Sequence, residues 1–411
     1  MHILLKNFKS LNLYEWILML YPFTLFKSTI INIFLFLTSC IFLYEIFKKK
    51  KITFLNMTWL YFYIIFFFYN VLNSFFATDY LNALQSSIFQ FKFLFFSLFI
   101  FTCIPNCKNL DFIIKIWAIL LLLVSLDGIY QYFFFTDIFN FPRGETRITG
   151  PFGTRAVIGG YLTIIGIPII FYYFSKFNNY NLSKKIILLT LYLILFFTVV
   201  LSGERLSLII FLSSTIIIFA FYTNIKKLLT FLVFSIFTLY LTFILSSVFN
   251  NRINDLINIL SNFYTSSYGR LYESSFLLFQ KHLFFGVGFK NYRVDCLAQF
   301  DPRPESRFQF CSTHPHNLYL ELLSESGIIG FFLFILVFYY FFSYVIRQIK
   351  KNKNKKTFNQ FSSLMYGHLL VIFIYLFPLK TSGSFFTTYN ASFFWFSLGF
   401  VLLILKRKSV N

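Results

Sequence analysis

A short polar segment ending in two histidines is the stretch of this sequence best suited to chemistry. It reads His314-Pro315-His316-Asn317, and a long apolar run starts directly after it. Proline suits the first turn of a helix, where its missing N–H costs nothing, and it disfavours helical geometry in the residue before it. We therefore expect a helix to begin beside His316. The positive end of that helix would favour a neutral imidazole, the form that acts as a general base, and would attract an anionic ligand such as a phosphate ester.

Helical spacing places two glycines on the same face as His316. At roughly 100° per residue, the residues within about 40° of it are Leu320, Leu323, Gly327 and Gly330. Small residues on one face of a membrane helix let a neighbouring helix approach closely. We expect Gly327 and Gly330 to lie at such a helix contact.

Two other roles are open to these histidines. His314 and His316 could share a zinc ion, but the large polar region adds only His282, and no cysteine or carboxylate stands at a familiar ligand spacing. We therefore expect no metal site. The second alternative is a purely structural histidine at a helix end.

The composition excludes a soluble globular protein. Hydrophobic residues make up 58% of the 411 residues and charged residues 12%. The apolar residues form runs of about 15–25, the length of helix that spans a bilayer. The predicted fold is therefore an all-α, polytopic integral membrane protein. Its first apolar run is interrupted by Glu15, so we expect no cleavable signal peptide.

The charges indicate topology rather than a nucleic-acid partner. A net charge of +21 would point to nucleic acid in a soluble protein, but most of the lysines lie in short loops at alternate ends of the apolar runs. Lysine-rich loops remain cytoplasmic, so we expect both termini in the cytoplasm and the acidic loops outside it. We expect about twelve spans, near residues 12–27, 29–47, 54–76, 86–104, 112–134, 157–175, 186–201, 206–222, 228–249, 317–346, 361–379 and 391–405.

These spans divide the chain into five segments. They are N-terminal transmembrane helices (1–134), a first outward loop (135–156), central transmembrane helices (157–249), a large outward loop (250–316) and C-terminal transmembrane helices (317–411). The large loop opens amphipathically, and we expect a helix at the membrane surface in its middle, because its apolar runs are too short to span.

Basic residues near the expected outer face are candidates for binding an anion. Arg205 stands at the junction of two spans, where a buried arginine is costly unless it binds an anion or pairs with an acid such as Glu204. Arg270 lies in the large loop, and its planar fork can donate two hydrogen bonds to one phosphate. Weaker candidates are Arg147 and Arg155, whose alternative is a solvated loop face, and Lys92, whose alternative is to reach the membrane interface.

Two cysteines of the large loop are expected to pair. Cys296 and Cys311 both fall in 250–316, where the compartment would be oxidising. A disulfide would close a loop of about 15 residues, would contribute roughly 3 kcal/mol, and would tether the segment that leads to His316.

One motif also resembles a known family. His316-Asn317, nine residues, and then Gly327-Ile328-Ile329-Gly330 are similar to the C-terminal motif of the O-antigen ligase and O-antigen polymerase superfamily. The resemblance covers about residues 143–346 and includes a Gly-Arg pair at Arg270, followed by a Gly-x-Gly turn at 286–288. It also includes the arginine at Arg205, although many members have a small residue where Glu204 stands.

The resemblance implies an enzyme of the bacterial inner membrane that works on the periplasmic face. A glycan would pass from undecaprenyl diphosphate to a hydroxyl of lipid A–core or another glycan acceptor, without a cofactor. His316 would act as the general base, and Arg205 and Arg270 would hold the diphosphate. Supporting roles would fall to His314, Asn317, Arg147, Arg155 and Lys92.

Alternatives to a ligase stay open. A polymerase of the superfamily would share these residues, but polymerases commonly have two loops of comparable size, whereas 135–156 is much shorter than 250–316. A flippase or transporter would place its polar residues near the midplane of broken helices. A structural scaffold would have no reason to gather arginines and histidine at one face.

Overall fold

The computed structural model describes most of the chain. Its described residues are 8–49, 57–104, 107–222, 247–299, 311–352, 356–381 and 383–406, with scattered residues between 229 and 243. Across these ranges the chain is helical, and its β-type pairing is one isolated bridge between Thr136 and Pro142. The predicted all-α, polytopic membrane fold is therefore confirmed.

The helices follow one another along the whole described chain. In order they are α2 (Leu13–Thr24), α3 (Ser28–Lys49), α4 (Thr58–Asn73), η1 (Ser74–Phe76), α5 (Tyr80–Phe89), α6 (Phe91–Cys103), α7 (Leu110–Phe134), η2 (Gly150–Phe152), α8 (Ile158–Phe174), η3 (Phe177–Asn179), α9 (Leu182–Leu201), α10 (Arg205–Tyr222), α12 (Ser247–Ser261), η4 (Phe263–Thr265), α13 (Ser267–Lys281), α14 (Tyr292–Gln299), α15 (Leu318–Asn352), α16 (Lys356–Leu376) and α17 (Thr388–Lys406).

The apolar helices agree with most of the expected spans. Within the described residues, eight are long and apolar enough to cross a membrane, and two more, Ile158–Phe174 and Phe361–Leu376, are apolar but shorter. These ten coincide with ten of the twelve expected spans. The expected span 12–27 corresponds to α2, which has 12 residues and contains Pro22. The expected span 228–249 falls mainly outside the described residues.

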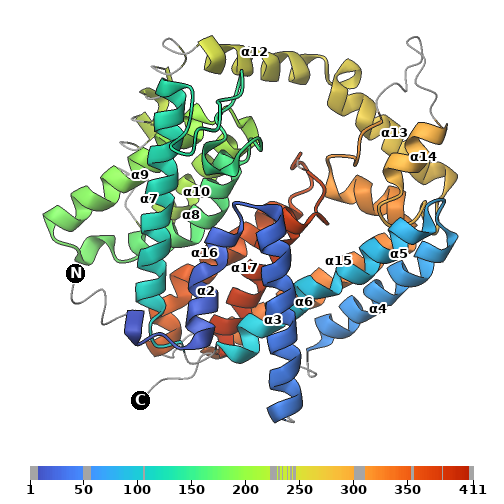
Figure 1. Ribbon diagram of the computed structural model, residues 1–411, viewed down its shortest axis with the longest axis horizontal. Coiled ribbons are helices and arrows are strands. Elements are labelled where there is room, and N and C mark those ends of the chain that lie inside the picture. The colour runs from blue at the N-terminus through green and yellow to red at the C-terminus, as the bar shows by residue number, and fades with distance from the viewer. Residues whose placement is uncertain are drawn as a thin grey trace.

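Helix α17 forms the centre of the bundle (Figure 1). Its residues from Ala391 to Leu405 are all buried, and it packs against α3, α6, α15 and α16. A helix that is apolar all round must be covered on every side to be stable in this way. Gly399 permits the close contact with α6, since a Cβ there would lie 2.8 Å from the Ser97 carbonyl oxygen.

The amphipathic helices α12, α13 and α14 form a polar layer at one edge. Figure 1 shows α12 running along this edge, from the side that carries α7, α9 and α10 to the side that carries α13 and α14. Helices α13 and α14 pack against α15 and share a small core of Leu271, Leu278, Val287, Tyr292 and Cys296. The polar layer thus has a small hydrophobic core of its own.

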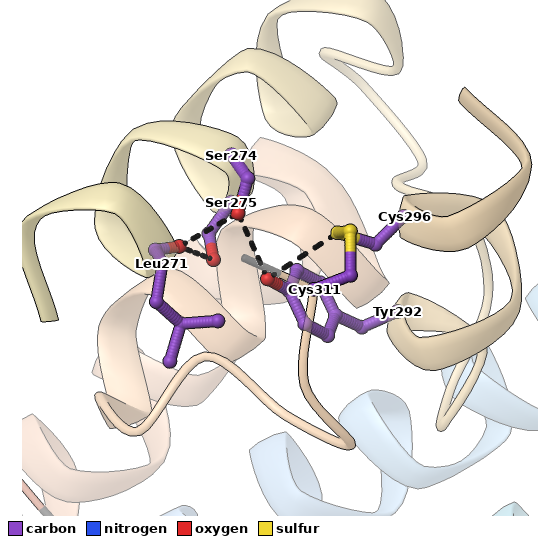
Figure 2. The surroundings of a disulfide bond; sticks show 6 residues. All are labelled: Leu271, Ser274, Ser275, Tyr292, Cys296 and Cys311. Carbon is purple, nitrogen blue, oxygen red and sulfur yellow. Dashed lines mark hydrogen bonds between the residues drawn. A yellow bond between two sulfur atoms is a disulfide. The ribbon is translucent and has the colours of Figure 1, made fainter. Parts of the chain in front are cut away.

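A disulfide joins this layer to the segment before α15. Cys296 of α14 is bonded to Cys311, the pair expected from the sequence (Figure 2). Beside it the Tyr292 hydroxyl lies 3.1 Å from Ser274 Oγ of α13. The chain leading to His316 is therefore fixed to α13 and α14.

Helix α15 is broken at Gly327, contrary to the expectation of a continuous helix. Gly327 has φ 63° and ψ −171°, so Gly327 and His316 cannot share one helical face. The break exposes carbonyls of α15, and the Gly286–Gly288 turn satisfies them: Val287 N donates to Ser324 O and Gly288 N to Glu325 O, both at 2.9 Å. A Cβ on Gly327 would lie 2.2 Å from the Phe284 carbonyl oxygen. Gly327 therefore contacts this turn rather than a neighbouring helix.

Gly330 does lie at a helix contact, as expected. A Cβ there would come 3.0 Å from the ring of Tyr69 on α4, the helix that packs against α15. The Tyr69 hydroxyl donates to the Ser326 carbonyl at 2.7 Å, and Asn73 donates to the Phe285 carbonyl at 2.7 Å. Helix α4 thus holds both the broken helix and the turn that fills its break.

Candidate active site

The helix expected to start beside His316 begins two residues later. Asn317 caps α15, because its Oδ1 accepts hydrogen bonds from Tyr319 N at 3.0 Å and Leu320 N at 3.2 Å. Pro315 therefore lies outside the helix, and its expected place in the first turn is wrong. The asparagine side chain satisfies the first free N–H groups of the helix, which a proline at that position cannot do.

His316 itself adopts a left-handed backbone conformation. Its φ is 56°, a value that costs a non-glycine residue about 1–3 kcal/mol. Asn317 holds the next position by donating from Nδ2 to the Pro378 carbonyl at 2.7 Å, and the Tyr319 hydroxyl donates to the Leu376 carbonyl. The loop between α16 and α17 thus fixes the backbone that places the His316 imidazole.

The first turn of α13 lies beside His316. The Tyr268 ring contacts the imidazole edge-on, with centroids 6.1 Å apart. Ser266 caps α13 by accepting from Gly269 N, and Gly269 allows α13 to start against η4, since a Cβ there would lie 2.0 Å from the Phe263 carbonyl oxygen. Arg270 follows in the same turn, half-buried, and its side chain has no hydrogen bond or ion pair within the described part of the chain.

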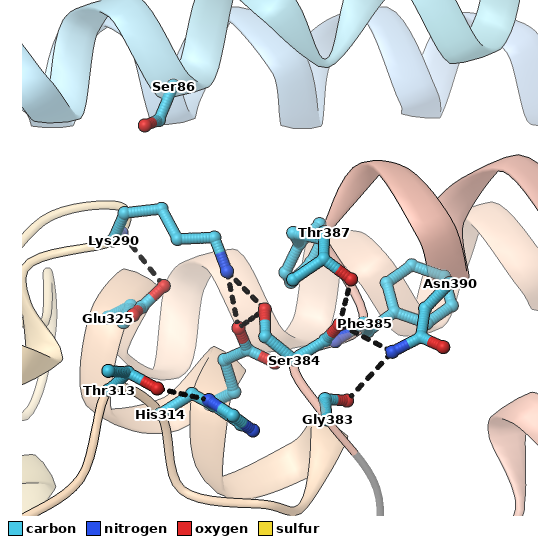
Figure 3. Close-up of polar contacts among 12 residues, drawn as sticks. Ser86, Lys290, Thr313, His314, Glu325, Gly383, Ser384, Phe385, Thr387 and Asn390 are labelled. Atoms are coloured by element: carbon cyan, nitrogen blue, oxygen red, sulfur yellow. Dashed lines mark hydrogen bonds and ion pairs between the residues drawn. The ribbon is translucent and has the colours of Figure 1, made fainter. Parts of the chain in front are cut away.

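His314 packs against His316 with ring centroids 4.1 Å apart. Its Nδ1 lies 2.9 Å from the Thr313 hydroxyl, and its Nε2 is buried with no hydrogen-bond partner among the described residues (Figure 3). Burial, and then the charge of His316, lower the pKa of His314 to about 4. His314 is therefore neutral at neutral pH and adds no positive charge beside His316.

A buried ion pair that sequence reasoning missed lies close to His314. Lys290 Nζ is 2.9 Å from Glu321 Oε1 and also bonds the Ser384 hydroxyl, while Lys290 N donates to Glu325 Oε2 at 2.9 Å (Figure 3). The Glu321 carboxylate also accepts from Phe385 N at 3.1 Å. The sequence does contain a signal for this pair. Glu321 and Glu325 stand one helical turn apart in an apolar run, and buried acids require a partner. This cluster ties the loop before α14, helix α15 and the loop before α17 together.

The structure assigns Glu204 a different partner from Arg205. The Glu204 carboxylate accepts from Gly159 N at 2.7 Å, Gly160 N at 3.0 Å and the Ser207 hydroxyl at 2.9 Å, so it caps the start of α8. The alternative in which Glu204 neutralises Arg205 is therefore wrong. Arg205 instead donates from Nη1 to the Arg252 carbonyl of α12 at 3.4 Å.

The weaker basic candidates separate into two groups. Arg147 lies against the turn that precedes Arg205, since a Cβ on Gly203 would come 3.4 Å from Arg147 Cγ. Arg155 instead donates to the Phe26 carbonyl at the end of α2. Lys92 donates to Asn32 Oδ1 of α3 at 2.8 Å and reaches the Thr388 hydroxyl at 3.5 Å. The structure thus places Arg147 at the Gly203 turn, whereas Arg155 and Lys92 connect transmembrane helices.

Residues 190–335 match the family model described as O-antigen ligase. This region of the chain is therefore similar to the O-antigen ligase superfamily. This confirms the resemblance seen in the sequence, and it supports a ligase- or polymerase-type function with lipid-linked glycan substrates. A comparison with curated proteins finds no match.

The O-antigen ligase region contains most of the geometry described above. It includes Arg205, the polar layer of α12, α13 and α14, His316 and the break in α15. Two residues outside the matched range contact this region. Arg147 lies against Gly203, and the Ser384 hydroxyl bonds Lys290 of the Lys290–Glu321 pair. Side chains from both flanks of the O-antigen ligase region thus take part in the candidate site.

Proposed function

We propose that this protein is an O-antigen ligase-like glycosyltransferase. It moves a glycan from undecaprenyl diphosphate to a hydroxyl of a lipid A–core acceptor, on the periplasmic face of the inner membrane, with both termini in the cytoplasm. The observation that carries the proposal is the packing of His316 against the turn of α13 that bears Arg270, inside the O-antigen ligase region.

The chemistry assigned to these residues is a direct transfer. The His316 imidazole accepts the proton of the acceptor hydroxyl, and the hydroxyl oxygen attacks the anomeric carbon of the glycan. The bond between that carbon and the diphosphate oxygen breaks, and its electron pair leaves with undecaprenyl diphosphate. Arg205 and Arg270 stabilise the charge that develops on the diphosphate. A general base of this kind contributes roughly 10²–10⁴-fold to the rate.

The environment of His316 supports its role as a base. Its neighbour His314 remains neutral until the pH falls to about 4, so His316 has no cationic imidazole beside it at neutral pH. A second positive charge there would disfavour proton uptake by His316. The pair therefore suits one histidine that accepts protons and one that does not.

A flippase or transporter is the alternative from another class. Broken helices are typical of transporter binding sites, and α15 is broken at Gly327. The carbonyls at this break, however, accept from Val287 and Gly288 of the neighbouring turn and so are not free to bind a substrate. This observation favours the enzyme.

The loops support a ligase over a polymerase. The described residues between 247 and 317 contain three α-helices and one 3-10 turn, whereas the connection between α7 and α8 contains a single 3-10 turn. One dominant polar region suits one bulky lipid-linked donor and an acceptor that arrives from the membrane, anchored by its own acyl chains. A polymerase would be expected to balance two loops, because it handles two lipid-linked glycans.

Deletion of the protein tests this assignment in cells. Loss of a ligase should leave long polymer on undecaprenyl diphosphate and bare lipid A–core, as read by gel and by mass spectrometry of lipid extracts. Core that carries a single repeat unit would instead identify a polymerase. Glycan that stays on undecaprenyl diphosphate at the cytoplasmic side would identify a flippase.

A further inference from the structure

Three arginines from different segments converge on the Gly203 turn between α9 and α10. Gly203 has φ 69°, and its carbonyl accepts from Arg252 Nε of α12 at 3.4 Å. Arg205 follows two residues later and donates to the Arg252 carbonyl, while the Arg147 side chain lies against Gly203 from the α7–α8 connection. Sequence reasoning did not single out Arg252, because its position in an amphipathic helix resembles a solvated face.

The positive charge of this group is poorly compensated. Burial and then the charges of Arg147 and Arg205 lower the pKa of Arg252. Asp255 lies 3.9 Å away, but its side chain is 57% exposed while that of Arg252 is only 14% exposed. Glu204 is engaged with the start of α8. The Glu204 carboxylate also interacts electrostatically with Arg147, so two carboxylates face three guanidinium groups. The three cations still repel one another unless a further anion joins them.

Arg252 also has a donor without a partner. Its Nη2 is buried and makes no hydrogen bond within the described residues. An unsatisfied buried donor is costly, more so on a charged group, and in a native protein such a donor usually bonds water or a bound ligand. An oxygen of a bound anion would satisfy it.

We infer that Arg252 is a further ligand of the diphosphate of the lipid-linked donor, in addition to Arg205 and Arg270, and that it forms an anion site with Arg147 and Arg205. The inference rests on the proposed function, in which Arg205 binds that diphosphate. Guanidinium groups suit it because each can donate two parallel hydrogen bonds to phosphate oxygens. Helix α12 then serves as part of the donor site rather than as a passive connection.

Tyr268 connects this anion site to the candidate base. Its hydroxyl contributes to the electrostatic environment of Arg252, and its ring contacts His316. Tyr268 therefore interacts with both the anion site and the candidate base. A phospholipid headgroup offers the same phosphate chemistry, but with a single negative charge it matches three arginines less well than a diphosphate does.

The test is the binding of undecaprenyl diphosphate to the purified full chain in detergent, with competition by undecaprenyl monophosphate and phosphatidylglycerol. Arg252→Gln should weaken binding of the diphosphate about tenfold or more, because a charge-assisted hydrogen bond is lost. The two competitors should bind more weakly than the diphosphate to wild type. If phosphatidylglycerol competes equally with the diphosphate, the site belongs to a lipid headgroup and the inference is wrong.

Two further variants make the result specific. Arg143→Gln is the charge-matched control, since Arg143 donates to the Tyr132 carbonyl at 2.9 Å within its own hairpin, and its binding should equal wild type. Asp255→Asn removes the carboxylate beside Arg252 and should keep or tighten binding. Wild-type affinity in folded Arg252→Gln, with affinity lost in Arg205→Lys, would overturn the inference and leave the proposed function intact. Absence of binding to wild type would overturn the proposed function itself.

Discussion

His316 has a strained backbone that contacts on both sides maintain. The Cys296–Cys311 disulfide fixes the chain before it, and Asn317 fixes the chain after it through the Pro378 carbonyl. A conformation that costs about 1–3 kcal/mol persists only where its surroundings determine it, and such residues cluster at functional sites. The strained backbone of His316 is therefore consistent with its proposed role as the base.

Replacement of His316 by asparagine separates chemistry from folding. Asparagine tolerates the left-handed region, so His316→Asn should leave the thermal unfolding midpoint in detergent unchanged. Transfer of glycan should fall by roughly 10²–10⁴-fold, because the base is lost. A folded His316→Asn protein that transfers glycan at the wild-type rate would exclude the general-base role.

The lowered pKa of His314 predicts that the protein loses stability in acid. This pKa is lowered from 6.5 to about 4 in the folded protein, so between these values the unfolded chain binds a proton that the folded chain does not. Stability should therefore fall as the pH drops from about 6.5 to 4, and this contribution should be absent above that window. His314→Gln should reduce the fall in unfolding midpoint across the window. Identical pH profiles for wild type and variant would contradict the assignment.

Lysine cannot replace arginine in a site that depends on paired hydrogen bonds. Arg205→Lys and Arg270→Lys keep the charge but lose the planar fork, so each should weaken binding of undecaprenyl diphosphate by about tenfold. Equilibrium binding to the purified variants measures this. Unchanged affinity in both would show that neither guanidinium binds the donor.

The residues that could be predicted from the sequence are those in local motifs. His316, Arg205 and Arg270 are candidates because of their spacing, their neighbours and the family resemblance. Lys290 and Arg252 were not, because their partners lie on other segments: Lys290 pairs with Glu321 of α15, and Arg252 bonds Gly203. Glu321 and Glu325 indicate locally that a buried partner is needed, but which cation supplies it depends on tertiary contacts.

At the scale of the element, the break in α15 is the feature that lets the Gly286–Gly288 turn bond to this helix. The helical pattern continues through Gly327, so periodicity alone predicted an unbroken helix. The break is stable because the 283–288 segment, distant in sequence, donates to the carbonyls that the break leaves free. The ends of most transmembrane helices were predictable, since they follow from where apolar runs stop.

Alanine at Gly327 should disrupt this arrangement. Gly327 has φ 63°, and a Cβ there would lie 2.2 Å from the Phe284 carbonyl oxygen, so Gly327→Ala should destabilise the fold by more than about 1 kcal/mol. Gly166→Ala in α8 is the control, because its Cβ would meet Leu195 at 3.5 Å, an ordinary contact. Thermal unfolding in detergent compares the two. Equal midpoints would show that the break does not require glycine.

At the scale of the whole molecule, a helix bundle carries a polar layer on one edge. Composition and apolar run lengths predicted the membrane fold, because lipid requires helices whose backbone groups are paired. The way α12 joins the Gly203 turn to α13 could not be predicted, since it depends on contacts between segments far apart in the sequence. This link brings the arginines of one side towards the histidine of the other.

Reconstituted transfer tests the central claim most directly. Purified protein is mixed with a glycan on undecaprenyl diphosphate and with lipid A–core, and both products are followed by mass spectrometry. We predict that the glycan becomes bonded to lipid A–core and that free undecaprenyl diphosphate is released, without added nucleotide. Glycan that is transferred only to a second lipid-linked glycan, or that stays on its carrier while His316→Asn behaves like wild type, would contradict the account.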